Sequence, residues 1–276
     1  MKNLKNSKTK KKLSHSSTKK IYELLCQFFR YYYIKQPYSN PMLIATKPKN
    51  KNESVQEEVL IIWDDDEMTA LSKIAAMPYV NGESGFLHGL AIIFVMWAFL
   101  RIGEARGLQW KDIDLENGTV NVYKQMSRVK NREGIKPKYI EELVTPKYKS
   151  IRKYKLNSMA LDAIREYKKR KRPKSEEEFV FESRGKVLAD TTIKNTYLKM
   201  VERAGLDPNK HVTIHGLRHS GISYMLRHKV PVEVVSKMAG HKSIQMTLEV
   251  YYSVIEEQKN EAIEVLNKEH AIKFIA

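Results

Sequence analysis

The stretch from His215 to Tyr251 gathers side chains that could do chemistry on a phosphate group. It begins H-G-L-R-H-S, which supplies His215 and Arg218, continues to A-G-H at His241, and ends T-L-E-V-Y at Tyr251. A cation, two imidazoles and a phenol lie in one stretch, and no metal-ligand spacing accompanies them. This combination is suited to phosphate chemistry in which a tyrosine acts without a metal.

A phenol that attacks a phosphodiester needs help from other parts of the chain. Arginine forks hold the non-bridging oxygens, and Arg101 together with Arg218 would hold them from two sides. A tyrosine has an ordinary pKa of about 10, so Tyr251 needs a base or cationic surroundings, which His215 and the arginines could provide. The product would be a covalent phosphotyrosine, which keeps the bond energy for rejoining.

The proton for the leaving 5′ oxygen could come from a lysine on a predicted hairpin. Alternating patterns at 139–144 and 151–156 predict two paired strands, joined by a turn that contains Lys147 and Lys149. Lys147 is the preferred general acid and Lys149 the alternative, although lysines in hairpin turns are usually only solvated. With an earlier hairpin around 112–123, these strands predict a small antiparallel sheet in a mainly α protein, the α+β class.

Three short helices would position the residues of the reactive stretch. Thr213 suits the N-cap of the first, so His215 and Arg218 would share a face of its first turn, where backbone amides favour an anion. A second helix would end at Gly240, directly before His241. A third short helix would then lead to the tyrosine.

Arg101 follows a strongly apolar helix predicted over residues 86–100. An arginine at the end of a buried helix is costly unless it is paired or bound to an anion. Glu104, three positions further on, could simply form a salt bridge with it. Alternatively, Arg101 is a phosphate ligand that Glu104 supports, and the sequence leaves both interpretations open.

Two further helices are predicted from their capping residues. The acids 64–66 precede a helical pattern at 68–77, where carboxylates accept amide bonds and favour the helix dipole. A metal site is the alternative interpretation of these acids. Asp190 could cap a helix over 191–204, and Gly205 suits the position after its end.

Composition points to a polyanionic partner. The chain of 276 residues has 49 Lys and Arg against 32 Asp and Glu, a formal net charge of +17. A surplus of this size favours nucleic acid, whereas a membrane surface would call for a basic amphipathic helix or a lipidation signal. The single cysteine, Cys26, excludes an internal disulfide. The basic N-terminus lacks an apolar signal region, and a cytoplasmic protein is expected.

The chain divides into two predicted domains. Residues 1–58 comprise a basic tail, a helical segment capped by Ser16 or Ser17, and a polar linker over 46–58. Residues 59–276 form the main domain and end in a tail helix with a partly apolar stripe. That stripe would pack on its own domain or, alternatively, on a neighbouring copy.

From about residue 64 to 253, the sequence resembles the catalytic domain of the tyrosine recombinases, the phage integrase family, and especially integrases of Gram-positive phages and conjugative transposons. Four motifs carry the resemblance: L-R-I-G-E-A-R-G-L from Leu100, T-P-K-Y-K-S from Thr145, H-G-L-R-H-S with A-G-H, and T-L-E-V-Y. Ala98 and Phe99 stand where the family usually has Thr and Gly. Residues 16–45 resemble only the last helices of the family's core-binding domain, so the chain looks truncated at its front.

The resemblance implies a set of site residues that need no cofactor and no metal. These are Arg101 and Arg218 on the scissile phosphate, Lys147 as general acid, His215 and His241 as supporting imidazoles, and Tyr251 as nucleophile. The adjacent Tyr252 would be the nucleophile if the motif were shifted by one residue, but the spacing favours Tyr251.

The function implied is that of a site-specific recombinase, which cleaves and rejoins DNA through a covalent 3′-phosphotyrosine. Its partners would be double-stranded core sites and three further copies in a tetramer, with an accessory bending or directionality factor, in the bacterial cytoplasm at the nucleoid. A second hypothesis is a DNA-binding remnant without recombination activity. A type IB topoisomerase uses similar groups and is the third.

Overall fold

A computed structural model describes residues 12–48, 60–78, 85–132, 137–146, 150–250 and 252. The chain separates into two compact units, Met1–Val59 and Leu60–Ala276, each with its own contacts. The predicted tail helix after Tyr251 lies outside the described residues. None of the helices in the described part is long and apolar enough to cross a membrane.

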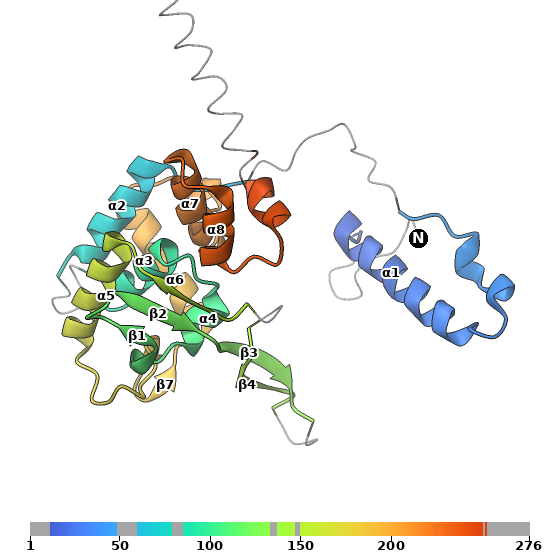
Figure 1. Cartoon of the computed structure of the whole chain (residues 1–276), viewed down its shortest axis with the longest axis horizontal. Coiled ribbons are helices and arrows are strands. Elements are labelled where there is room, and N and C mark those ends of the chain that lie inside the picture. Colours follow the sequence, from blue (N-terminus) through green and yellow to red (C-terminus); the bar gives the residue numbers. More distant parts are fainter. Residues whose placement is uncertain are drawn as a thin grey trace, which may run out of the picture. The chain divides into compact units, whose positions relative to one another are not determined.

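The first unit is built on one long helix, α1, which spans His15–Tyr32 (Figure 1). Its N-cap is Ser14, whose Oγ accepts from the Ser17 amide at 3.2 Å, so the prediction of Ser16 or Ser17 as cap was wrong. Short 3₁₀ turns at Pro37–Ser39 and Pro41–Leu43 follow. The cap lies earlier because the apolar pattern that suggested the start begins later than the helix does.

Helix α3, Gly89–Trp97, forms the centre of the second unit (Figure 1). Every residue in it is buried, because α2, α5, α6 and α7 all pack against it. A helix that is apolar all round is stable only in such surroundings. It is shorter than the predicted 86–100, and it stops before Phe99, whose φ of +53° is incompatible with a right-handed helix.

Helix α2, Asp65–Ala76, begins with a capping box. The Asp64 carboxylate accepts from the Glu67 amide at 2.9 Å, and the Glu67 carboxylate accepts from the Asp64 amide at 2.8 Å. Asp64 thus caps the helix, which is the role that the sequence analysis expected for carboxylates at this position. Within the described residues, no cluster of three or more acids, histidines or cysteines could hold a metal ion.

In the described part of the chain, the strands form three small antiparallel sheets instead of one. The first has the order β1-β2-β5, the second pairs β3 with β4, and the third pairs β6 with β7. Their bounds are Ile113–Asp114, Thr119–Val122, Gln125–Lys130, Tyr139–Val144, Arg152–Lys155, Glu182–Ser183 and Lys186–Val187 in chain order. Figure 1 shows β3 and β4 projecting from the body of the unit.

The predicted pairing of 139–144 with 151–156 was wrong. β4 pairs with β3, with Gln125 opposite Val144, whereas β5 pairs with β2, with Val122 opposite Arg152. The alternating pattern identified both segments as strands, but alternation does not say which strand lies alongside. The polar sequence of β3 also concealed the true partner of β4.

Helices α5, Ser158–Lys171, and α6, Asp190–Arg203, pack on the other sides of the core. Asp190 is not the cap of α6, because the N-cap is Ala189 and the Asp190 carboxylate forms an ion pair with Arg106 at 2.9 Å. The carboxylate of Asp190 thus binds Arg106, which is distant in sequence, instead of a backbone amide at the start of α6. Gly205 follows the helix with a φ of +68°, as predicted.

The elements that carry the reactive stretch are α7, Ile214–Arg227; α8, Val232–Ala239; and a helix over 244–250, while α4, Ile102–Gly107, follows Arg101 and contains Glu104. A second apolar cluster joins α7, α8 and the helix over 244–250 to the end of α3. It consists of Phe99, Ile222, Leu226, Val235, Ala239 and Val250. This cluster fixes where the ends of α8 and the last helix lie.

Candidate active site

Arg218 lies inside the second unit, on the first turns of α7. Thr213 is the N-cap as predicted, since its Oγ1 accepts from the Gly216 amide at 3.0 Å. The Arg218 side chain is 1% exposed, and burial lowers its pKa to about 9, so it remains a cation at neutral pH. Among the described residues, its Nε is a buried donor without an acceptor. A buried donor of this kind calls for an explanation, and a bound ligand is one that fits a cation in this position.

The backbone at Phe99 supplies one partner of Arg218. Arg218 Nη1 donates to the Phe99 carbonyl at 2.7 Å. Phe99 has a φ of +53°, in the left-handed region that favours glycine, and it occupies the position where the resemblance expects glycine. The ring is buried in the second apolar cluster, which offsets the strain of this conformation.

Arg101 forms the salt bridge to Glu104 that the sequence left open. Its Nη1 donates to Glu104 Oε1 at 2.9 Å, and its backbone amide donates to Oε2 at 2.9 Å. Nη1 also contacts Ser150 Oγ at 3.3 Å, and Nη2 donates to the Gly240 carbonyl at 2.9 Å. The side chain is 16% exposed, so the ion pair orients Arg101 and leaves part of it accessible.

Glu104 is a buried carboxylate among three arginines. Arg152 binds both of its oxygens, at 3.0 and 2.9 Å, and Arg218 lies 3.7 Å away. Burial alone would raise the pKa of Glu104, but the hydrogen bonds and charge of Arg152, followed by the charge of Arg218, bring it below its ordinary value. The carboxylate is therefore ionised and holds the three cations together.

Sequence reasoning missed Arg152. It lies on β5 and is 8% exposed. A signal was present, because Arg152 and Tyr154 alternate with exposed residues and so share the inward face of the strand. A cation on an inward face requires an acidic or carbonyl partner.

The C-terminus of α8 meets all three arginines. Each of three successive carbonyls accepts from a different one: Met238 from Arg152, Ala239 from Arg218, and Gly240 from Arg101. Carbonyls at a helix C-terminus carry partial negative charge, so cations are stabilised there. The helix ends at Gly240, with a φ of +66°, directly before His241 as predicted.

The two predicted imidazoles lie close to these cations and are neutral. Burial, followed by Arg218 and Arg101, lowers the pKa of His241 to about 3, and the same three causes lower the pKa of His215. His241 Nδ1 forms a hydrogen bond with Thr247 Oγ1 at 2.7 Å. Thr247, the first residue of the T-L-E-V-Y motif, is fully buried in the helix over 244–250, and the sequence analysis gave it no role of its own.

His219 is a third histidine of the site that the sequence analysis did not select. Its ring contacts that of His215 edge to face, with 4.6 Å between the centroids. Burial and the neighbouring His215 lower its pKa to about 4. It lies one turn after His215, a spacing that could have suggested the contact.

The structure brings together Arg101, Arg218 and His241, with His215 at the edge of the group. Lys147 and Tyr251 lie outside the described residues, as does the alternative Lys149. Their roles therefore stay predictions from sequence.

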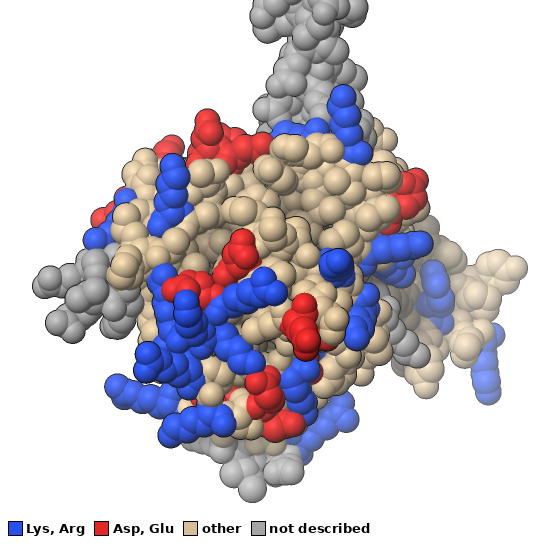
Figure 2. Space-filling view, turned by 60° about the vertical axis from the view of Figure 1, so that its left-hand side comes forward, with Lys and Arg blue, Asp and Glu red and all other residues tan. Residues whose placement is uncertain are grey.

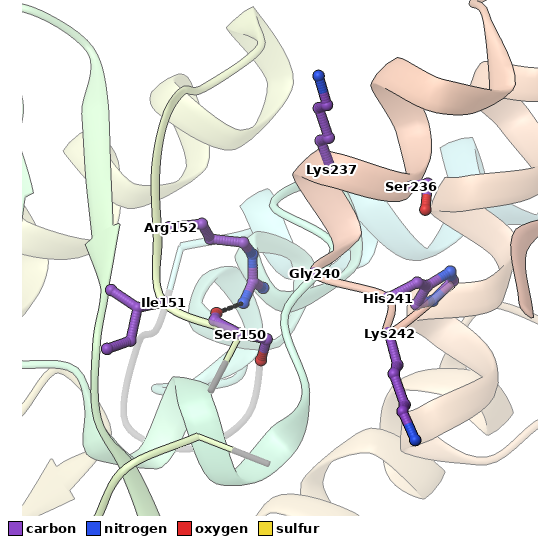
Figure 3. A pocket seen from close by; sticks show the side chains of 8 residues that line it. All are labelled: Ser150, Ile151, Arg152, Ser236, Lys237, Gly240, His241 and Lys242. Atoms are coloured by element: carbon purple, nitrogen blue, oxygen red, sulfur yellow. Dashed lines mark hydrogen bonds between the residues drawn. The ribbon is translucent and has the colours of Figure 1, made fainter. Parts of the chain in front are cut away.

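A cavity of about 380 Å³ opens beside the arginine cluster (Figure 3). Ser150 and Arg152 line one side, and Gly240 with His241 lines another. In Figure 3, Arg152 reaches from the β5 side toward the end of α8. The side chains of Arg152, Lys237 and Lys242 and the neutral imidazole of His241 line this cavity, which suits the binding of an anion.

Comparisons with known proteins agree with this geometry. The pattern of the phage integrase family matches residues 64–258. The chain is 29% identical to a tyrosine recombinase XerC-like protein of Caldanaerobacter subterraneus, over 92% of this chain and 66% of that protein. It is 28% identical to the integrase of Staphylococcus phage L54a, over 61% of this chain and 48% of that integrase. The chain thus spans about two thirds of the first relative and half of the second.

Solved structures share the fold. The Tn1549 transposon integrase has a TM-score of 0.65 at 21% identity, covering 90% of this chain and 80% of that one. The XerH recombinase has a TM-score of 0.60 at 17% identity, covering 91% and 67%. The predicted α+β fold is confirmed. Since the family pattern covers most of the chain, this protein belongs to the phage integrase family.

Proposed function

We propose that the protein is a site-specific DNA recombinase that cleaves and rejoins DNA through a covalent 3′-phosphotyrosine at Tyr251. The observation that carries this proposal is the convergence of Arg101 and Arg218 on one buried carboxylate. They come from segments more than a hundred residues apart, and both contact Glu104. An ion pair made only for stability would not need a second cation at such a depth.

The arginines act on the scissile phosphate. Arg218 offers its unpartnered Nε, and Arg101 offers an accessible edge that Glu104 orients. Together they bind the non-bridging oxygens, on which charge develops as the nucleophile approaches. Because both sites are largely shielded from water, each hydrogen bond stabilises the transition state more than it would at the surface.

The chemical step is an exchange of one phosphorus–oxygen bond for another. The Tyr251 oxygen attacks phosphorus and loses its proton to His215, which is neutral and so able to accept it. The bond to the 5′ oxygen breaks, and Lys147 protonates the leaving group. Rejoining reverses these steps: a 5′ hydroxyl attacks the phosphotyrosine and releases the phenol.

The partner is double-stranded DNA that carries core recombination sites. The net charge of +17 fits a polyanion, and on the face in Figure 2 lysine and arginine side chains spread among fewer acidic ones. The related Tn1549 integrase was solved in complex with a circular intermediate DNA. XerH was solved bound to its difH substrate in a post-cleavage complex.

The higher organisation follows from the same proposal. Residues 1–58 would act as a partial core-binding segment, and residues 59–276 would form the catalytic domain. Four copies would act on two DNA sites, with the tail docking on a neighbour and an accessory factor bending the DNA. The protein would work in the bacterial cytoplasm at the nucleoid.

A nicked suicide duplex that carries the protein's own core site tests the function. Cleavage releases a short strand and traps the covalent adduct, which a denaturing gel separates from free DNA. We expect an adduct with the unaltered protein and with Tyr252→Phe, and none with Tyr251→Phe.

The same gel has two contrary outcomes. An adduct that survives Tyr251→Phe but disappears in Tyr252→Phe would show that the nucleophile is Tyr252 and not Tyr251. No adduct on either strand, with DNA binding intact, would identify a binding remnant instead of a recombinase.

A further inference from the structure

The arginine cluster contains one cation more than a two-sided phosphate clamp requires. On the basis of the proposed function, we propose that Arg152 is a positioning residue for the reaction. It holds the turn at residues 238–241 in place while Arg101 and Arg218 bind the scissile phosphate. Arg152 itself does not contact the substrate.

The contacts of Arg152 use nearly all of its donors. Nε donates to the Met238 carbonyl at 2.8 Å, and Nη1 donates to Glu104 Oε1 at 3.0 Å and to the Ser150 carbonyl at 3.2 Å. Nη2 donates to Glu104 Oε2 at 2.9 Å. Four of about five N–H groups of a guanidinium are thus occupied. Little of the side chain is left for a phosphate.

The face of the same guanidinium lies against Gly240. A β-carbon at Gly240 would lie 2.8 Å from Arg152 Nη1, closer than real β-carbons approach, and 3.0 Å from Arg152 Cζ. Only glycine permits this contact, and the φ of +66° at Gly240 also favours glycine. Arg152 therefore fixes the turn by a hydrogen bond at Met238 and by direct contact at Gly240.

The other two arginines divide their donors between the turn and the substrate. Arg218 and Arg101 each donate to one carbonyl of the turn, and each would also bind a phosphate oxygen. Arg152 has no part in phosphate binding, so its contacts with the turn stay the same when the substrate binds.

The turn leads directly to the reactive groups. His241 follows Gly240, and its amide donates to the Ser236 carbonyl at 3.1 Å. Its ring is tied to Thr247, in the helix over 244–250 that leads to the proposed nucleophile. A displaced turn would thus move both the imidazole and that helix. Misplacement by about 1 Å is enough to slow a reaction about 100-fold.

The cavity beside Arg152 makes the proposal testable by chemical rescue. Arg152 lines that cavity of about 380 Å³ together with Gly240 and His241 (Figure 3). Truncation to alanine would join the vacated space to the cavity. Methylguanidinium could then enter from solvent and restore the contacts to Glu104 and the turn.

Arg170 provides a matched control. It donates to the Met77 carbonyl at 2.9 Å, to the Ala76 carbonyl at 2.7 Å, and to the Glu166 carboxylate at 2.8 Å. It therefore holds the end of α2 with the same kinds of bond that Arg152 uses at the end of α8. Arg170→Ala measures what the loss of such an arginine does to the fold alone.

The experiment compares the unaltered full-length protein with Arg152→Ala and Arg170→Ala. With saturating protein on the suicide duplex, we expect Arg152→Ala to cleave about 100-fold more slowly. Its Kd for DNA should change by no more than about threefold, because phosphate contacts elsewhere dominate affinity. Methylguanidinium should restore at least about tenfold of the lost rate in Arg152→Ala, and it should not change the rate of Arg170→Ala, which should match that of the unaltered protein.

Hydrogen exchange supplies a readout that does not depend on activity. In Arg152→Ala, the amides of residues 238–250 should exchange faster, and methylguanidinium should slow them again. Arg152→Lys serves if the alanine variant does not fold. It keeps a cation beside Glu104 but lacks the guanidinium fork. Its cleavage rate and amide exchange should therefore lie between those of the unaltered protein and Arg152→Ala.

Three outcomes separate the possibilities. Unchanged cleavage and exchange in Arg152→Ala would overturn the positioning role. A loss of DNA affinity as large as the loss of rate would also overturn it, since Arg152 would then bind substrate. If the unaltered protein forms no adduct, the proposed function fails, and the exchange of residues 238–250 still decides whether Arg152 holds the turn.

Discussion

Two helix ends in this protein are both held by arginine, yet they differ in kind. At the end of α2, Arg170 is the one arginine of the described residues that donates to the last carbonyls, and its partner Glu166 is 42% exposed. At the end of α8, three arginines donate to three carbonyls and surround Glu104, which is fully buried.

The difference separates capping from function. One partly exposed arginine is enough to satisfy the carbonyls of a helix end. Three buried cations carry a large desolvation penalty, which a single carboxylate does not fully offset. A protein that keeps such a cluster gains something other than stability, and a phosphate that completes the charge balance is the natural explanation.

The largest effect is expected for Arg218→Lys, in the rate of DNA cleavage. Lysine keeps the charge but cannot reach both the Phe99 and Ala239 carbonyls while it binds a phosphate oxygen. We expect the cleavage rate on the suicide duplex to fall by about 1,000-fold, the loss typical of a removed transition-state donor. DNA binding, measured by fluorescence anisotropy, should weaken by less than about tenfold. Equal losses in both measurements would assign Arg218 to binding alone.

Removal of the central carboxylate should have the next largest effect. Glu104→Gln leaves three buried cations without a counter-charge, so the free energy of unfolding in urea should drop by about 3–5 kcal/mol. The matched change Glu166→Gln, in the carboxylate that pairs with Arg170, should reduce it by less than about 1 kcal/mol. Similar losses for the two variants would remove the distinction between the two helix ends.

The lowered pKa of Glu104 predicts that its contribution to stability depends on pH. The pKa of Glu104 is lower in the folded protein than its ordinary value of 4.5. Its contribution to stability is therefore complete above pH 4.5 and is lost as the pH falls through the folded pKa. The difference in unfolding free energy between the unaltered protein and Glu104→Gln should shrink on acidification below that value. A difference that grows instead would contradict the lowered pKa.

Two glycines that end helices offer a smaller test. Gly240 and Gly205 have φ values of +66° and +68°, but a β-carbon would strike Arg152 at Gly240 and meet nothing within 4 Å at Gly205. Gly205→Ala should lower the free energy of unfolding in urea by about 1–2 kcal/mol, from backbone conformation alone. Gly240→Ala should lower it by about 1–3 kcal/mol more, because the Arg152 guanidinium must move. Equal losses would mean that Arg152 does not press on the turn.

The smallest effect is expected from Arg170→Ala. Loss of one partly exposed cap should lower the free energy of unfolding by about 1 kcal/mol. Thermal denaturation would measure the loss, and the cleavage rate should stay unchanged. A slower cleavage rate would show that the two helix ends are coupled.

Local signals in the sequence predicted the parts of the site that depend on neighbours in the chain. Thr213 began α7 and Gly240 ended α8 as expected, since capping involves residues three or four positions apart. His215 and Arg218 consequently fell on the predicted turn. The family and the α+β class were also predicted correctly from the motifs.

Predictions failed where a distant residue competed with a local partner. Asp190 was expected to cap α6 but instead pairs with Arg106. The strand at 139–144 was expected to pair with 151–156 but pairs with β3 instead. The prediction failed because the polar sequence of β3 gave no sign of a strand.

The sequence by itself determined which side chains are available and where the helices that carry them begin and end. Those features depend on contacts within one helical turn, which the order of residues prescribes directly. Only the tertiary structure decided that Arg101, Arg152 and Arg218 share one buried carboxylate and one helix end. That arrangement depends on contacts between β5, α4, α7 and α8, segments whose approach follows from the packing of the whole core. The same packing lets Arg152, whose inward position on β5 was the only local signal, bind both Glu104 and the end of α8.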